Sequence, residues 1–130
     1  MTSAESFAKR VFFWASIYGF LVIAPQYFLE ERIGRDNPPP ITHPEHFYGF
    51  VGVALAWQLA FYLIARDPQR LRPIIPAAVA EKWLFGIAAM KLLYDGRVQS
   101  ILGLFAGIDI VLGILFLIAY LRLGLALAEN

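Results

Sequence analysis

Long apolar stretches separated by short charged segments dominate the pattern of this chain. Residues 11–29 and 47–65 carry no charged side chain, and residues 101–121 are interrupted only by Asp109. About 20 apolar residues are enough to cross the hydrocarbon core of a bilayer as a helix. The pattern therefore predicts three membrane-spanning helices.

A fourth apolar stretch, residues 74–94, is long enough to cross the bilayer but carries the adjacent charges Glu81 and Lys82 near its centre. Such a helix depends on its neighbours for stable insertion, because charges are costly in the hydrocarbon. We expect an all-α polytopic membrane protein, an antiparallel bundle of four transmembrane helices. Residues 1–130 should form a single transmembrane domain.

Composition agrees with a membrane protein, since 59% of the residues are hydrophobic, 16% are charged and the mean hydropathy is +0.61. Soluble domains contain about 25% charged residues. The run after Lys9 and Arg10 is longer than the apolar core of a secretory signal and lacks a clear cleavage site, so we interpret it as a retained helix.

The distribution of basic residues near the span ends predicts the orientation of the chain. They are more frequent on the side of both termini (Lys9, Arg10, Arg66, Arg70, Arg72 and Arg122) than on the opposite side (Arg32, Arg35, Lys91 and Arg97). Lys and Arg favour the cytoplasmic side. We expect both termini in the cytoplasm, with a lipid bilayer as the surroundings.

Charge and motifs exclude several classes of function. The net charge of +1 and the lack of a basic cluster give no signature of nucleic-acid binding. The absence of cysteine excludes disulfides, thiolate metal sites and covalent haem attachment. The sequence has no phosphate-binding loop, nucleophile elbow, HExxH or kinase motif, and it identifies no cofactor.

The connections between spans predict how the helices are joined. Residues 30–45 contain Pro38, Pro39 and Pro40, which favour an extended strap on the outer face. Asp67 followed by Pro68 is typical of a helix start, and Gly96 of a helix end. Because these two connections are short, consecutive helices should be antiparallel neighbours.

Small residues recur every four positions in two spans, which favours close contact between helices in lipid. They are Gly52, Ala56 and Ala60 in the second span, and Gly103 and Gly107 in the fourth. Packing within one bundle is the favoured interpretation, with contact between copies in a homo-oligomer as the alternative.

Polar side chains are expected at similar depths in all four spans. At 1.5 Å per residue, Tyr18, Gln58 and Glu81 lie roughly 3 to 5 Å on one side of the midplane, and Asp109 about 3 Å on the other. The long stem of Lys82 could reach Asp109. Glu81 and Lys82 point about 100° apart, so they should not face the same point. The carboxyl left without Lys82 should be protonated or hydrogen-bonded, and Gln58 and Tyr18 are suitable partners.

This polar layer has a structural and a functional interpretation. Buried pairs can simply fix helix packing, whereas intramembrane ionisable residues more often mark function. The leading hypothesis is a site formed by Tyr18, Gln58, Glu81, Lys82 and Asp109 that binds a small hydrophobic ligand or a membrane partner, including a larger complex. The alternatives are an enzyme on a lipid-soluble substrate, with Glu81 or Asp109 as acid or base, and a proton or ion conductor.

A second group of polar residues precedes the second span. Thr42 and Glu45 match a capping box, which is the favoured interpretation. His43 and His46 could instead share a helix face and hold a metal with Glu45 or Asp36, but the segment lacks a clear distant ligand. A metal site is therefore not favoured here.

Four short segments resemble small bacterial four-helix membrane proteins called DoxX-like, a group without an established activity. They are residues 47–52 (FYGFVG), 81–82 (EK), 107–113 (GIDIVLG) and 119–122 (AYLR). The resemblance implies a four-helix fold in the bacterial inner membrane. The layout is also similar to sterol-isomerase-like domains, which use membrane-embedded acids. None of their motifs matches residue by residue, so no catalytic residue is implied.

Overall fold

The computed structural model describes residues 1–129, and every regular element in that range is a helix. The elements are α1 (Ser3–Ile23) with a short 3-10 helix (Ala24–Phe28), α2 (Glu30–Asp36), α3 (Pro44–Arg66), a 3-10 turn (Arg72–Ile74) leading into α4 (Ile75–Tyr94), and α5 (Ser100–Ala128). Within these residues four helical segments are long and apolar enough to cross a membrane. The predicted all-α fold with four apolar spans is confirmed.

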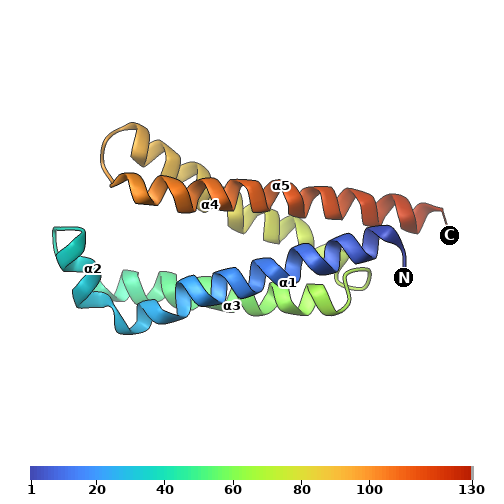
Figure 1. Cartoon of the computed structure of the whole chain (residues 1–130), viewed down its shortest axis with the longest axis horizontal. Coiled ribbons are helices and arrows are strands. Elements are labelled where there is room, and N and C mark those ends of the chain that lie inside the picture. The colour runs from blue at the N-terminus through green and yellow to red at the C-terminus, as the bar shows by residue number, and fades with distance from the viewer. Residues whose placement is uncertain (130) are drawn as a thin grey trace.

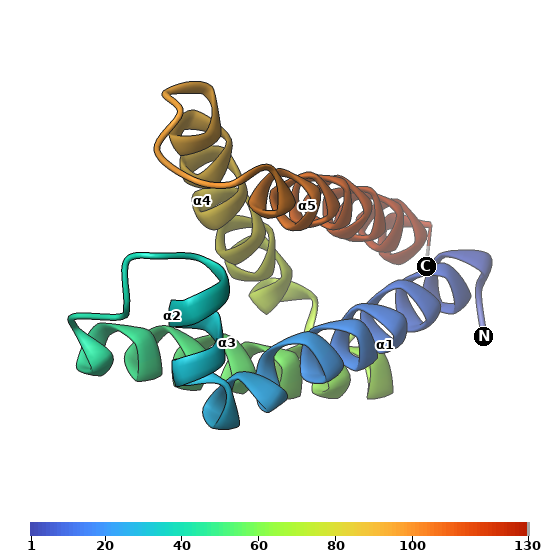
Figure 2. The ribbon, with the colours of Figure 1, turned by 60° about the vertical axis from the view of Figure 1, so that its left-hand side comes forward.

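The long helices form two antiparallel pairs. α1 packs on α3, α4 packs on α5, and α1 also contacts α5 (Figure 1). Both termini and the α3–α4 connection lie at one end, whereas α2 and the α4–α5 turn lie at the other (Figure 1). α3 and α4 make few contacts despite their short connection, contrary to the expectation that they are close neighbours. Figure 2 shows α4 leaning away from the α1–α3 pair.

Three aromatic side chains hold the two pairs together in the half nearer the termini. Phe12 of α1, Phe61 of α3 and Phe116 of α5 are all fully buried. The ring of Phe116 stacks on Phe12 at 4.2 Å and meets Phe61 edge-on at 5.0 Å, both measured between centroids. Stacked and edge-on pairs are favourable arrangements for aromatic rings. This cluster is defined here as the phenylalanine plug.

Hydrogen bonds also join the helices at the end near the termini. Arg72 donates from Nε to the Tyr120 carbonyl at 3.0 Å, and its guanidinium lies 3.9 Å above the Tyr120 ring centre. Gln69 donates to the Glu5 carboxylate at 2.8 Å, which ties the α3–α4 connection to α1. These contacts join α1, α5 and the α3–α4 connection at the end near the termini.

Two details of the outer segment differ from expectation. Residues 30–36 form helix α2 rather than an extended strap, and the non-helical part is limited to residues 37–43, which include the three prolines. The capping box expected between Thr42 and Glu45 is not formed, because α3 begins at Pro44 and His43 is its N-cap, without a side-chain bond. Thr42 therefore lies one residue too early to cap this helix.

The remaining junctions are partly as expected. Gly96 has φ +72° and its amide donates to the Leu93 carbonyl at 3.0 Å, which confirms the predicted end of α4. Asp67 accepts from the Arg70 amide at 3.3 Å, but it starts only a single turn. Because Pro73 follows, the long helix α4 begins only at Ile75.

Candidate functional site

A buried ion pair joins the second helix pair at mid-depth. Lys82 Nζ of α4 donates to Asp109 Oδ1 of α5 at 3.3 Å, which confirms the predicted pair. The same ammonium lies 3.8 Å from Glu81 Oε2. The side chain of Lys82 is 3% exposed, against 18% for Glu81 and 14% for Asp109. One ammonium thus serves two carboxylates.

Glu81 and Lys82 come closer than their positions on the helix suggested. We expected adjacent residues to point about 100° apart and not to share a site. The long side chains instead turn toward each other, so both carboxylates lie within 4 Å of the ammonium. On its other side the ammonium lies 5.2 Å from the centre of the Phe61 ring, a cation–π contact with α3.

Close packing of α4 on α5 brings the pair together. A Cβ on Gly86 would lie 2.8 Å from Ile110 Cγ1 and 3.2 Å from the Ala106 carbonyl oxygen, so the helices approach at this glycine. Trp83 Nε1 donates to the Ile110 carbonyl at 3.2 Å, and its indole lies against Gly113. These contacts fix the register in which Lys82 faces Asp109.

A cavity of about 820 Å³ lies beside the ion pair, between the two helix pairs. Tyr18, Glu81, Lys82 and Asp109 line it, together with apolar residues and residues of the outer segment and the α4–α5 turn. The other lining residues include Val22, Phe50, Phe85, Phe105, Pro38, Pro39, Gln26, Arg97 and Gln99. The cavity therefore runs from the charges toward the end opposite the termini.

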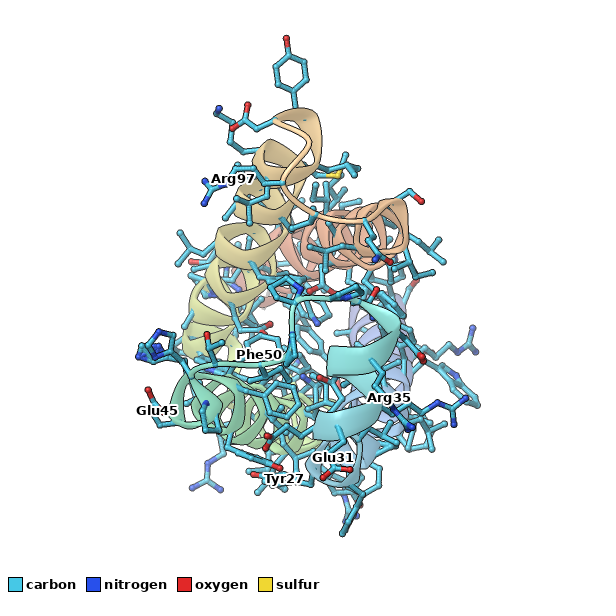
Figure 3. All side chains as sticks on the ribbon, turned by 90° about the vertical axis from the view of Figure 1, so that its left-hand side faces the viewer. Tyr27, Glu31, Arg35, Glu45, Phe50 and Arg97 are labelled. Atoms are coloured by element: carbon cyan, nitrogen blue, oxygen red, sulfur yellow. The ribbon has the colours of Figure 1, made fainter. Side chains whose placement is uncertain are left out.

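Figure 3 looks along the molecule from that open end. Phe50 lies between α3 and α4, and Arg97 stands at the α4–α5 turn, while Glu45 and Arg35 are at the outside of the bundle. The rings of Phe50 and Phe85 lie 5.8 Å apart between centroids, across the gap between α3 and α4. This aromatic contact bridges two helices that otherwise barely touch.

Gln58 does not share the cavity with the other polar residues. Its side chain is 3% exposed and lies between α3 and α1, where a Cβ on Gly19 would overlap its amide. Nε2 donates to the Ala54 carbonyl at 2.9 Å, whereas Oε1 has no hydrogen-bond partner among residues 1–129. The structure thus assigns Gln58 to the α1–α3 contact.

The expected hydrogen bonds from Gln58 or Tyr18 to a spare carboxyl are not formed. Tyr18 lines the cavity at the level of the charges, but it makes no side-chain hydrogen bond within the described chain. Oε2 of Glu81 is buried and likewise has no hydrogen-bond partner within those residues. The amide of Gln58 instead donates to Ala54 of its own helix, and Tyr18 reaches the cavity without bonding to either carboxyl.

The lining residues outside the polar layer were not predicted. Phe50, Phe85 and Phe105 belong to spans in which aromatic residues are common, so no local signal marked them. For Arg97 and Gln99 the sequence contains a weak indication. The short turn after Gly96 places both residues at one membrane face, in the connection between α4 and α5. Their place on the cavity depends on the separation of the helix pairs.

The histidine segment is a surface feature. His43 Nδ1 lies 3.2 Å from Glu45 Oε1, and the rings of His43 and His46 stack at 5.2 Å between centroids. All three side chains are mostly exposed. Asp36, the remaining candidate ligand, is within 3.6 Å of Arg32 instead. Residues 1–129 contain no group of three or more His, Cys, Asp or Glu side chains placed to hold a metal ion.

The glycines that recur every four positions differ in how closely other side chains approach them. A Cβ on Gly52 would meet the Tyr27 hydroxyl at 3.2 Å and one on Gly103 would meet Leu93 at 2.5 Å, so both positions serve packing within the chain. Gly107 has open space around its missing Cβ.

No family model matches this sequence, and comparisons with curated proteins and with solved structures likewise find no match. The resemblance to DoxX-like proteins therefore rests on the four short segments alone.

Proposed function

We propose that this membrane protein binds a small lipid-soluble molecule between its two helix pairs, with the polar group of that molecule at Glu81, Lys82 and Asp109. The observation that carries the proposal is the cavity of about 820 Å³ with the ion pair beside it. Ligand pockets typically measure roughly 300 to 1,000 Å³ and combine apolar walls with a few converging polar groups.

The charges favour a ligand that donates hydrogen bonds or carries a positive charge. Glu81 and Asp109 share Lys82, so one ionised carboxylate would remain uncompensated. An isolated charge in a low-dielectric site is costly unless a partner satisfies it. An amine or hydroxyl group can provide that partner, whereas a carboxylate or phosphate would add to the negative charge.

The phenylalanine plug supports binding over ion conduction. Phe12, Phe61 and Phe116 fill the bundle on the side of the termini and are fully buried. A conducting path needs polar groups or water across the whole bilayer. The cavity instead leads away from the plug toward α2 and the α4–α5 turn.

The orientation of this cavity follows from the basic residues near the span ends. With the termini in the cytoplasm of a bacterial cell, α2 and the α4–α5 turn face outward. The ligand would then reach the cavity from the outer leaflet or the external solution. A direct route from lipid is the weakly packed gap between α3 and α4.

Three probes with one chain length test the proposed chemistry. Decylamine, decanol and decanoate are added to the purified full-length protein, and the melting temperature is measured. We expect the amine to stabilise most and the carboxylate least. Glu81→Gln should abolish the preference for the amine, and Glu45→Gln, at an exposed acid outside the cavity, should keep it. Equal stabilisation by all three probes would contradict recognition by the carboxylates.

A further inference from the structure

A second hollow, of about 420 Å³, lies between α1 and α3 near the end that holds the termini. It is lined by Lys9, Arg10, Phe13 and Trp14 of α1 and by Tyr62, Ala65 and Arg66 of α3. It shares no residue with the cavity beside Lys82. Anything bound here is therefore independent of the ligand proposed above.

The charges in this hollow are all positive. Lys9, Arg10 and Arg66 line it without an acidic residue, and none of them forms an ion pair within residues 1–129. Arg66 Nη1 instead donates to the Tyr62 hydroxyl at 3.2 Å, which holds the guanidinium at the edge of the hollow. Three cations from two helices thus converge without a counter-ion from the part of the chain that the structure describes.

The nearest acids are engaged elsewhere. Glu5 accepts hydrogen bonds from the Thr2 hydroxyl and from the Gln69 amide group. Asp67 accepts from the backbone amide of Arg70. Since both carboxylates are bonded to other groups, the positive charge of the hollow is left for solvent or an external anion to balance.

An apolar surface adjoins the cations on the side of the bilayer. Trp14 is 64% exposed, and Phe13 meets it edge-on at 5.2 Å between ring centroids. These rings follow Lys9 and Arg10 by one helical turn, which places them deeper in the predicted span. The small, buried side chain of Ala65 lines the hollow on the α3 side.

We propose that this hollow binds an anionic phospholipid of the leaflet on the side of the termini. The phosphate would lie among Lys9, Arg10 and Arg66, and an acyl chain would run along Phe13 and Trp14. Basic pockets between transmembrane helices attract acidic headgroups, and aromatic rings pack well at the headgroup level. A soluble phosphate would use the cations but gain nothing from the exposed rings.

Native mass spectrometry of the full-length protein in detergent tests the proposal. The protein is titrated with phosphatidylglycerol, phosphatidylcholine or soluble glycerol phosphate. The fraction of protein that carries the added ligand gives the affinity for that ligand. We expect tighter binding of phosphatidylglycerol than of the other two. Arg66→Gln should weaken it about fivefold, because one basic residue near a membrane surface contributes ~1 kcal/mol. Trp14→Ala should weaken it as well.

Arg70→Gln is the matched control, since Arg70 is exposed at the same end but outside the hollow. It should leave the affinity unchanged. Equal losses in Arg66→Gln and Arg70→Gln, or equal binding of phosphatidylcholine, would overturn the proposal. So would equally tight binding of glycerol phosphate, which would indicate a phosphate site rather than a lipid site. Because Lys9, Arg10 and Arg66 make no ion pair within residues 1–129, Lys9→Gln and Arg10→Gln repeat the test if Arg66→Gln is unstable.

Discussion

Lys82 of α4 and Asp109 of α5 form a buried ion pair at 3.3 Å across the contact between two helices. Glu81 lies within 4 Å of the same ammonium. The pair is therefore both a packing contact and one wall of the cavity. Its energetic role can be separated from its proposed role in binding by substitution.

Removing Lys82 alone should be worse than removing Lys82 together with Asp109. Lys82→Met should lower stability by about 3 kcal/mol, because both buried carboxylates lose their partner. Asp109→Leu should cost less, because Glu81 still lies 3.8 Å from the ammonium. The double variant should recover part of the loss seen in Lys82→Met, since only Glu81 then stays unpaired. Thermal unfolding in detergent measures the coupling. Additive losses without coupling would show that the two charges do not stabilise each other.

The exposed pair of Lys91 and Asp95 provides the control for that cycle. Its atoms are 2.6 Å apart at the end of α4, and the Lys91 side chain is 69% exposed. Exposed pairs contribute little to stability. Lys91→Met and Asp95→Leu should therefore change the melting temperature little, alone or together.

Gly86 should be intolerant of a side chain. In Gly86→Ala the new methyl group would meet Ile110 and the Ala106 carbonyl, forcing α4 away from α5. We expect a loss of about 1 to 2 kcal/mol, as is typical of overpacking. Gly49→Ala is the control, since the new methyl group would meet no atom of another helix or loop within 4 Å among the described residues. If both variants unfold at the same temperature as the unmodified protein, the helices are not in close contact at Gly86.

Topology is testable because the chain has no cysteine. Thr42→Cys lies before α3 at one end, and Arg70→Cys in the α3–α4 connection at the other, and both positions are exposed. An impermeant thiol reagent added to intact bacterial cells should label position 42 only. Both positions should react after the membrane is permeabilised. Labelling of position 70 alone in intact cells would reverse the orientation.

The spans could be predicted from the sequence because a bilayer imposes a length of apolar helix that is visible along the chain. The depth of the charges was accessible for the same reason, since 1.5 Å per residue converts position into depth. The pairing of Lys82 with Asp109 followed from that depth and from the reach of lysine.

The arrangement of the helix pairs was not predictable from these patterns. It depends on which side chains interlock, such as Gly86 with Ile110 and the phenylalanine plug, and no periodic signal identifies such contacts. Gln58 had the right depth, but its helix face is directed at Gly19, so it lies outside the cavity. The capping box predicted for Thr42 and Glu45 is not formed, because α3 begins at Pro44 and its N-cap is therefore His43.

The most direct test of the binding proposal is mass spectrometry of the small molecules that copurify with the protein. Val22→Trp places a large side chain in the cavity, and Val53→Trp places the same group on the exposed face of α3. We expect a lipid-soluble amine or alcohol in extracts of the unmodified protein and of Val53→Trp, and its loss from Val22→Trp. The same molecules at the same amounts in all three extracts would contradict a ligand site between the helix pairs.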